Sequence, residues 1–252
     1  MLVRYSFVFI VILLLTSCGS KDDTPVKSAD IQTEIIAKAD GSGETVIEAI
    51  LQVKANKNQS KDIEVELPFS IQAKVGEQTR TLFKTKRNGE TVYTTKLPTD
   101  SVDEKYVVSK VSGDKDSSNS FIILPQPFTI TSIPEKNYDR NQEINITWDN
   151  SKKDGKIEAG FALTCLGQGK PATVILRKQV SDNGLLNINA KELVDSADVK
   201  VDTSQGCEAM VILSRKTEKA LNPMFGEGSY TLGVQERSTN FSIKGKSDTT
   251  SL

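Results

Sequence analysis

The chain has 252 residues, with 32 basic and 33 acidic side chains, a net charge of −1 and no histidine. The balanced charge argues against a nucleic-acid partner, because no basic excess is available to neutralise phosphates. The lack of histidine removes the commonest general base and metal ligand, and with them Ser-His-Asp and Cys-His catalysis. We therefore predict a protein that is not an enzyme and that needs no cofactor or metal.

The first residues have the pattern of an export signal. Arg4 supplies positive charge, and an uncharged, mostly apolar run of about eleven residues follows from Tyr5 to Leu15. This run is too short to span a bilayer, since a transmembrane helix takes roughly 20 apolar residues. We expect residues 1–17 to be a cleaved signal peptide.

The apolar run ends in Leu15, Thr16 and Ser17, followed by Cys18. These residues resemble the lipobox of bacterial lipoproteins, in which an aliphatic residue and two small residues precede a lipidated cysteine. The resemblance implies that Cys18 becomes the acylated N-terminus and that acyl chains anchor the protein to a membrane, at about 0.8 kcal/mol for each buried methylene. The alternative is an ordinary cleaved signal with a chance cysteine.

The residues after Cys18 bear on location. Gly19 stands where aspartate marks inner-membrane retention in enterobacterial lipoproteins, so the resemblance implies the bacterial outer membrane. Residues 20–23 are similar to the short tag that sends lipoproteins to the cell surface in Bacteroidota, and a solvated tether explains them equally well. Periplasmic and cell-surface orientations both stay open. The polar composition of residues 18–30 predicts a flexible tether.

From Ile31 onward the apolar residues alternate with a period of two, for example at Ile47 and Ala49, which predicts half-buried strands. The pair Asn88–Gly89 separates two strand-like runs. It predicts a hairpin with a type I′ turn, because both residues tolerate a positive φ. The number and spacing of the strands predict a β-sandwich domain over residues 31–124.

Two prolines, Pro125 and Pro127, interrupt this pattern and cannot donate to a strand ladder, so we place a domain boundary there. A second β-rich domain is predicted over residues 128–246, with a helical turn at Ala190–Asp195 and a polar tail at residues 247–252. Its last part carries three short strand-like runs, at Glu208–Leu213, Tyr230–Gln235 and Phe241–Lys244.

Three segments of this second region share a known pattern: the opening strand Phe128–Pro134, the strand that ends Ile146–Trp148, and Gly228–Leu232. Together they resemble the immunoglobulin-like and fibronectin-like sandwich domains of bacterial envelope proteins. The resemblance implies an all-β chain of two tandem immunoglobulin-like sandwiches, with Tyr230 in a tyrosine corner whose hydroxyl bonds to backbone. We expect Trp148 in the core rather than on a sugar-stacking surface. A fold alone assigns no function.

Cys165 and Cys207 are the cysteines that remain once Cys18 carries lipid. Because an exported protein folds in an oxidising compartment, we predict a disulfide between them. It would close about 43 residues and contribute roughly 4 kcal/mol in the chain-entropy model. Their positions relative to Trp148 and Tyr230 exclude the antibody type of bridge. Free thiols and an intermolecular bond are the alternatives.

Two further features of the sequence bear on possible sites. Residues 114–119 begin like a calcium loop, but Asn119 and Pro125 stand where that loop needs Gly and a bidentate Glu, so a solvated turn is the better interpretation. The carboxylates cannot be paired across strands from sequence alone. They include Glu64, Glu66, Asp195 and Asp198.

These features together predict a non-catalytic, membrane-anchored envelope lipoprotein. Its role would be binding, adhesion or structural presentation, with an envelope protein or a glycan as partner. The alternative is a carboxylate-based envelope hydrolase or a glycan-binding accessory protein. A deep site with two close carboxylates would favour that alternative.

Overall fold

The computed structural model describes residues 31–53, 61–62, 69–112, 116–133, 136–149, 155–167, 170–198, 204 and 206–245. The described chain consists of strands, one 3₁₀ helix, η2 (Pro223–Phe225), and one α-helix, α1 (Ala190–Asp198). The predicted all-β class is confirmed. The predicted signal peptide, tether and polar tail lie outside the described residues.

Three sheets make up the structure. In spatial order, the long sheet contains β14 (Lys170–Ser181), β13 (Lys156–Gly167), β16 (Cys207–Ala220), β17 (Tyr230–Ile243), β1 (Ile31–Ala39), β2 (Thr45–Val53), β7 (Glu90–Leu97) and β6 (Phe83–Arg87). Two short strands extend it, β3 (Lys61–Asp62) beside β2 and β11 (Asn137–Tyr138) beside β17. The second sheet has the order β5 (Gln78–Thr81), β4 (Ser70–Val75), β8 (Tyr106–Ser112) and β9 (Asp116–Ile122). The third has the order β10 (Ile130–Ser132), β12 (Glu143–Trp148) and β15 (Leu185–Asn189).

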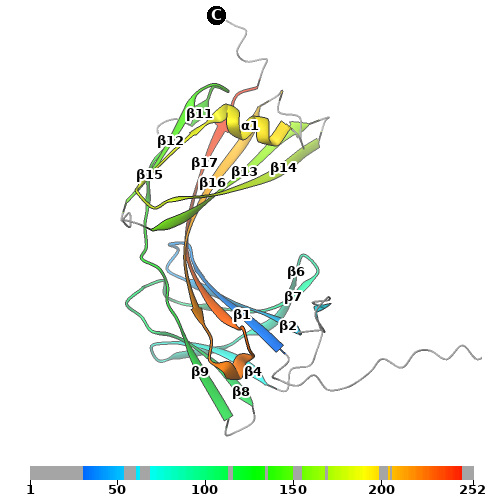
Figure 1. Ribbon diagram of the computed structural model, residues 1–252, viewed down its shortest axis with the longest axis vertical. Helices are drawn as coiled ribbons and strands as arrows, with labels where there is room; N and C mark the ends of the chain where they lie inside the picture. The colour runs from blue at the N-terminus through cyan, green and yellow to red at the C-terminus, as the bar shows by residue number, and fades with distance from the viewer. Residues whose placement is uncertain are drawn as a thin grey trace, which may run out of the picture.

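The sheets stack as two sandwiches, which form two lobes of a bent molecule (Figure 1). The long sheet lies on the inside of the bend. In the first lobe it faces the β5-β4-β8-β9 sheet, and in the second lobe it faces the β10-β12-β15 sheet and α1. Each lobe encloses its own apolar cluster, one containing Ile35, Ile47 and Tyr106, the other Ile144, Phe161 and Val211.

Strand alternation explains how the first lobe builds its core. Along β1 the burial alternates strictly, so that Ile35 and Ala37 are buried while Lys38 is exposed. The predicted Asn88–Gly89 turn is confirmed: it joins β6 to β7, and φ is 53° at Asn88 and 87° at Gly89. Those positive values are the ones that a type I′ hairpin turn requires.

Helix α1 is longer than the single turn predicted for Ala190–Asp195. Asn189 caps it, since its side-chain oxygen accepts a hydrogen bond from the backbone N–H of Lys191 at 2.8 Å. Leu193, Val194 and Ala197 then bury one face of the helix in the core of the second lobe.

The strands after Gly206 differ from the three short runs expected. Instead, β16 and β17 are two strands of 14 residues each, paired without a break from Cys207 opposite Ile243 to Ala220 opposite Tyr230. The sequence did not predict a strand at residues 214–220, because they are polar and lack a period of two. Backbone hydrogen bonds to β17 hold these residues in the strand, and no pattern of side chains indicates such bonds.

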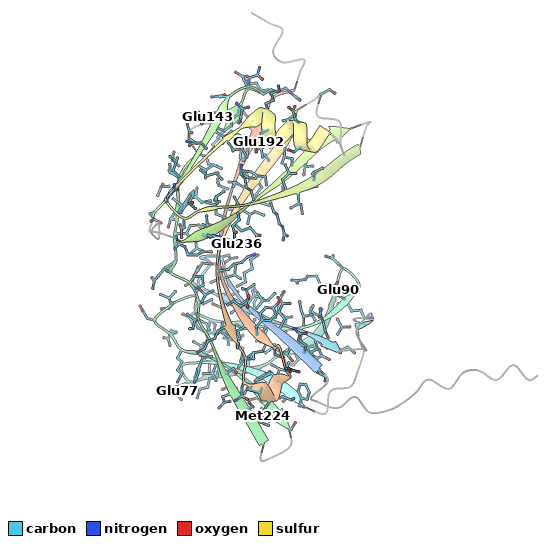
Figure 2. The ribbon with its side chains drawn as sticks, in the orientation of Figure 1. Glu77, Glu90, Glu143, Glu192, Met224 and Glu236 are labelled. Atoms are coloured by element: carbon cyan, nitrogen blue, oxygen red, sulfur yellow. A yellow bond between two sulfur atoms is a disulfide. The ribbon has the colours of Figure 1, made fainter. Side chains whose placement is uncertain are left out.

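The tip of this long hairpin lies in the first lobe, far from Glu143 and Glu192 of the second (Figure 2). Leu221 and Phe225 belong to the first apolar cluster. Thr33 of β1 donates its backbone N–H to Ser229 Oγ at 2.8 Å and its hydroxyl to the Phe225 carbonyl at 3.0 Å. The buried residues therefore do not divide along the predicted ranges 31–124 and 128–246, because the second range supplies part of the first core. As independent folding units, these ranges stay a prediction.

The hairpin also corrects the expectation for Tyr230. This residue opens β17 inside the first lobe, opposite Glu34 of β1, and is not at a turn between strands of the second sandwich. Burial is the main cause that raises the pKa of this phenol, and the neighbouring Glu34 carboxylate raises it further. The Gly228–Leu232 pattern thus marks a strand start but not a tyrosine corner.

A close backbone crossing joins the lobes at Gly233 in β17. A Cβ atom at this position would lie 1.9 Å from the carbonyl oxygen of Ile123, in the segment that leads from the first lobe to the second. No side chain fits into that space. Glycine is therefore required for β17 to pass directly against this connection.

A buried ion pair lies near the midpoint of the hairpin. Arg215 of β16 binds the Asp182 carboxylate through Nε and a second nitrogen at 2.7 and 2.9 Å, and the two side chains are 5% and 1% exposed. Trp148 Nε1 donates to the same carboxylate at 2.8 Å. Arg215 also donates to the Gln126 carbonyl and stacks over Phe128. The pair thus fixes the connection between the lobes, and Trp148 is confirmed as a core residue.

The predicted disulfide between Cys165 and Cys207 is present, with a Cα–Cα distance of 4.3 Å. The two residues stand directly opposite each other on β13 and β16, and both are buried in the second core. The bond therefore joins neighbouring strands of one sheet. The antibody-type bridge, excluded from the sequence, would have joined two facing sheets.

We expect Gly233→Ala to lower the free energy of unfolding by about 1–3 kcal/mol, because the added methyl group forces two backbones apart. Gly160→Ala is the matched control. Its Cβ would lie 3.7 Å or more from its neighbours, which is ordinary contact. Denaturant unfolding measures both variants, and equal losses would contradict the close crossing.

Asp182→Ala is expected to destabilise the fold by about 3–5 kcal/mol, since it leaves the Arg215 charge buried without its partner. The double variant Asp182→Ala/Arg215→Met should lose less than Asp182→Ala alone, because no unpaired charge remains. Lys178→Ala is the control, since it breaks an exposed pair with Glu192 and should cost less than about 1 kcal/mol. If the double variant were as unstable as Asp182→Ala alone, the unpaired charge of Arg215 would not be the cause of the instability.

Replacing both Cys165 and Cys207 by alanine should lower the free energy of unfolding by up to about 4 kcal/mol. Reductant should lower the melting temperature of the unmodified chain and leave that of the variant unchanged. Non-reducing mass spectrometry checks the pairing itself. Alkylation of both cysteines in the native, oxidised protein would be the contrary result.

Candidate functional site

A row of side chains crosses the outer face of the β5-β4-β8-β9 sheet. In β4 the residues Ala73 and Val75 point into the first core, so the intervening Lys74 points outward. Lys74 is in register with Val107 of β8, and Val107 with Phe121 of β9. Three strands therefore place a cation, an aliphatic side chain and an aromatic ring side by side.

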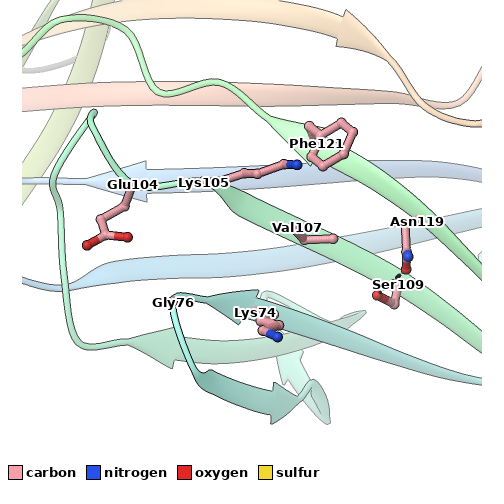
Figure 3. A pocket seen from close by; sticks show the side chains of 8 residues that line it. All are labelled: Lys74, Gly76, Glu104, Lys105, Val107, Ser109, Asn119 and Phe121. Atoms are coloured by element: carbon pink, nitrogen blue, oxygen red, sulfur yellow. Dashed lines mark hydrogen bonds between the residues drawn. The ribbon is translucent and has the colours of Figure 1, made fainter.

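A second, polar row lies next to the first. Ser109 of β8 is in register with Asn119 of β9, and the serine hydroxyl donates to Asn119 Oδ1 at 2.7 Å. The two rows line a pocket of about 480 Å³, shown in Figure 3. Its lining residues are Lys74, Gly76, Glu104, Lys105, Val107, Ser109, Asn119 and Phe121.

Cationic groups gather at the aromatic end of the pocket. The Lys105 ammonium lies 4.1 Å from the centroid of the Phe121 ring, and the Lys219 ammonium, from β16, lies 5.8 Å from it. Figure 3 shows Lys105 extended toward the ring and Glu104 directed away from it. The ring, in a side chain that is 40% exposed, attracts the cations through its electron-rich face.

The hairpin tip supports the strands under this pocket. Lys110, on the inward face of β8, donates to the Met224 carbonyl at 2.7 Å and lies over the Phe69 ring. Burial lowers the pKa of this lysine. On β9, Ser120 Oγ accepts the backbone N–H of Asn222 at 2.7 Å. The pocket therefore rests on residues that are far away in the sequence.

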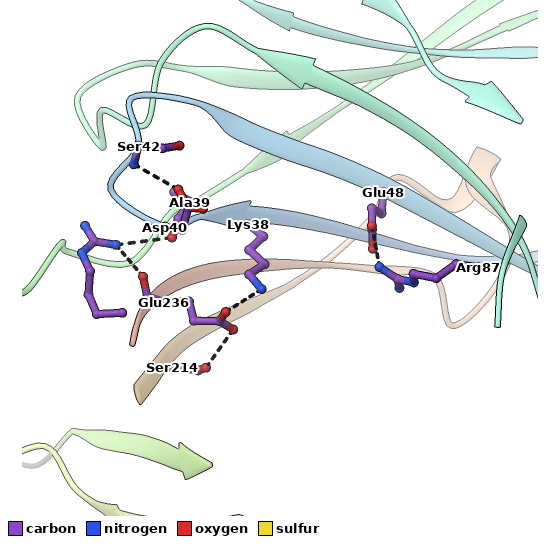
Figure 4. A network of polar contacts seen from close by, with 9 residues as sticks. Lys38, Ala39, Asp40, Ser42, Glu48, Arg87, Ser214 and Glu236 are labelled. Carbon is purple, nitrogen blue, oxygen red and sulfur yellow. Dashed lines mark hydrogen bonds and ion pairs between the residues drawn. The ribbon is translucent and has the colours of Figure 1, made fainter. Parts of the chain in front are cut away.

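A different arrangement of charges occupies the inner face of the long sheet (Figure 4). Lys38 Nζ lies 2.5 Å from Glu236 Oε1, whose carboxylate also accepts from Ser214. Arg87 pairs with Glu48 at 2.6 Å. These two pairs neutralise one another across strands, as expected of a solvated sheet surface.

Of the carboxylates considered from the sequence, only Asp195 has a described side chain, and it does not line the pocket. Glu64, Glu66 and the start of the calcium-like segment at 114–119 lie outside the described residues. Asp195 is exposed on α1 in the other lobe. Among the described residues, Glu104 is the single carboxylate that lines the pocket. In the part of the chain that the structure describes, no group of three or more metal-ligating residues occurs.

The lipidation residues cannot be placed, since Leu15, Thr16, Ser17 and Cys18 all fall outside the described ranges. Within those ranges, no helix is both long and apolar enough to cross a bilayer.

Sequence reasoning missed the pocket because its residues belong to no motif. Lys74 and Phe121 meet through the registers of β4 with β8 and of β8 with β9. Those registers cannot be read from one sequence. The exposed aromatic residue in the strand Asp116–Ile122 was the available signal, because a strand that alternates buried serines with an outward phenylalanine presents that ring to solvent.

No protein-family model and no curated protein sequence matches the chain. Among solved structures, it is similar to the native conformation of alpha-2-macroglobulin from E. coli, with 11% identity over 85% of this chain and 14% of that one and a TM-score of 0.26. Salmonella alpha-2-macroglobulin reacted with methylamine gives 12% identity, 85% and 15% coverage, and a TM-score of 0.26. Chicken CNTN1 FN1–FN3 domains give 9% identity, 84% and 64% coverage, and a TM-score of 0.23. The chain spans less than two thirds of each of these structures, and TM-scores this low carry no inference about function.

Proposed function

We propose that the chain is a lipid-anchored lipoprotein of the bacterial outer membrane that acts by binding rather than catalysis, through the pocket on its first lobe. The pocket carries this proposal. It combines lysines, a hydroxyl, an amide and an exposed aromatic ring with one carboxylate. A carboxylate-based hydrolase needs two such groups about the scissile bond, one as acid and one as base or nucleophile.

The anchor follows from the residues that precede the fold. Leu15–Thr16–Ser17–Cys18 has the order of a lipobox, and β1 begins at Ile31. Acyl chains on Cys18 would hold the protein at a membrane surface, because each buried methylene contributes about 0.8 kcal/mol. Only a short segment then separates the lipid from the first lobe. This proximity suits capture of a ligand close to the envelope.

The connection between the lobes, through the β16–β17 ladder and the contacts of Arg215, supports a role in presentation as well. The second lobe carries the disulfide and holds one half of the hairpin whose tip lies under the pocket. A binding site mounted in this way keeps its shape without bound ligand, so less ordering entropy is lost on binding. An envelope protein or a glycan remains the expected partner.

Cys18→Ala should abolish incorporation of labelled fatty acid and release or mislocalise the protein. The physical reason is that the remaining chain has no other apolar segment long enough to stay in a bilayer once the signal is removed. The variant with alanine at both Cys165 and Cys207 is the control and should keep its label. Membrane association and labelling that survive Cys18→Ala would refute the anchor.

A further inference from the structure

The cations around the pocket have no anionic partner among the residues that the structure describes. Lys74, Lys105 and Lys219 make no ion pair with any of the described residues, although two of them stack on Phe121. The nearest acidic lining residue, Glu104, points away from the ring (Figure 3). The pocket is therefore a local region of uncompensated positive charge.

Several other lysines on the sheets have an acidic partner. Lys38 pairs with Glu236, Lys96 with Glu44 and Lys216 with Glu158, at N–O distances of 2.5 to 2.8 Å. The whole chain has a net charge of −1. The positive charge at the pocket thus does not reflect a generally basic protein, and its unpaired lysines would attract an anion to this place.

The remaining lining residues define what kind of anion fits. Val107 and Phe121 offer an apolar floor, on which the C–H face of a sugar ring can stack. Ser109 and Asn119 beside them offer a hydroxyl and an amide that can exchange their mutual bond for bonds to sugar hydroxyls. The volume of about 480 Å³ lies within the range of small-ligand sites.

We propose that this pocket binds an acidic saccharide, with Lys74 and Lys105 holding its carboxylate or phosphate group and Phe121 carrying the sugar ring. The Lys105 ammonium would move from the exposed ring to the anion, a stronger partner than an aromatic face at a solvated site. This assignment rests on the binding role proposed above and does not depend on the lipid anchor.

Titration calorimetry on the full chain in detergent micelles tests the assignment. The probes are an oligogalacturonate for the carboxylate, mannose 6-phosphate for the phosphate, and maltotriose as the neutral sugar. We expect one of the acidic probes to bind, its affinity to fall as salt rises because the charges are partly exposed, and maltotriose to bind at least about tenfold more weakly. The acidic probe that binds more tightly identifies the anionic group.

The variant Lys74→Glu/Lys105→Glu should weaken binding of the acidic probe by about tenfold or more. Lys156→Glu/Lys191→Glu makes the same change in charge at exposed positions of the second lobe and should leave binding unchanged. For the ring, Phe121→Ala should weaken binding, whereas Phe83→Ala, at an exposed phenylalanine on the other sheet, should not. If circular dichroism shows that Lys74→Glu/Lys105→Glu is unfolded, Lys74→Gln/Lys105→Gln is used in its place.

Failure to bind either acidic probe would overturn the assignment, and so would equal binding of maltotriose. Equal weakening by the pocket variant and the second-lobe variant would show that general charge attraction, and not the pocket, holds the probe. None of these results alters the labelling of Cys18, which tests the anchor by itself.

Discussion

Both lobes depend on one uninterrupted backbone ladder, between β16 and β17. Its paired residues run from the disulfide end of the second lobe to the tip that lies in the first core. On one side of this ladder β13 continues the sheet, and on the other β1 does so in parallel register. A chain that folded as two separate sandwiches would divide the long sheet in two and so have two additional sheet edges to protect. Here the shared ladder removes the edges that would otherwise face each other at the junction.

Burial of the polar residues in the middle of the hairpin would destabilise the fold if they had no hydrogen-bonding partners. Arg215 lies there among Phe128, Trp148 and Asp182, and a buried guanidinium is tolerated only with a hydrogen-bonded counter-charge. Asp182 supplies that charge, and its second interaction with Trp148 satisfies the indole as well. A buried pair of this kind contributes little net stability. Its geometry selects one orientation of the connection between the lobes, because the Gln126 carbonyl accepts from the same arginine.

The parts of the fold that the sequence predicted are those governed by local rules. The alternation of apolar and polar residues predicted strands such as the one around Ile47. The preference of Asn and Gly for positive φ predicted the Asn88–Gly89 turn. The expected oxidising compartment predicted the disulfide between Cys165 and Cys207. The polar half of β16 could not be predicted, because its strand conformation is imposed by β17 and not by side-chain burial. The pocket could not be predicted for the same reason, since register between distant strands brings Lys74 beside Val107 and Phe121. The lipobox lies outside the described residues, so its interpretation still rests on the sequence.

The position of the pocket follows from the same ladder. Its strands β8 and β9 are held from beneath by the hairpin tip, through Lys110 to the Met224 carbonyl and through Ser120 to the backbone of Asn222. One of the cations at the pocket, Lys219, belongs to β16 itself. The pocket of the first lobe is therefore completed by a segment whose other end is cross-linked in the second lobe at Cys207. Since that segment cannot shift without disturbing both cores, the second lobe acts as a support that fixes where the positive charges of the first lobe stand.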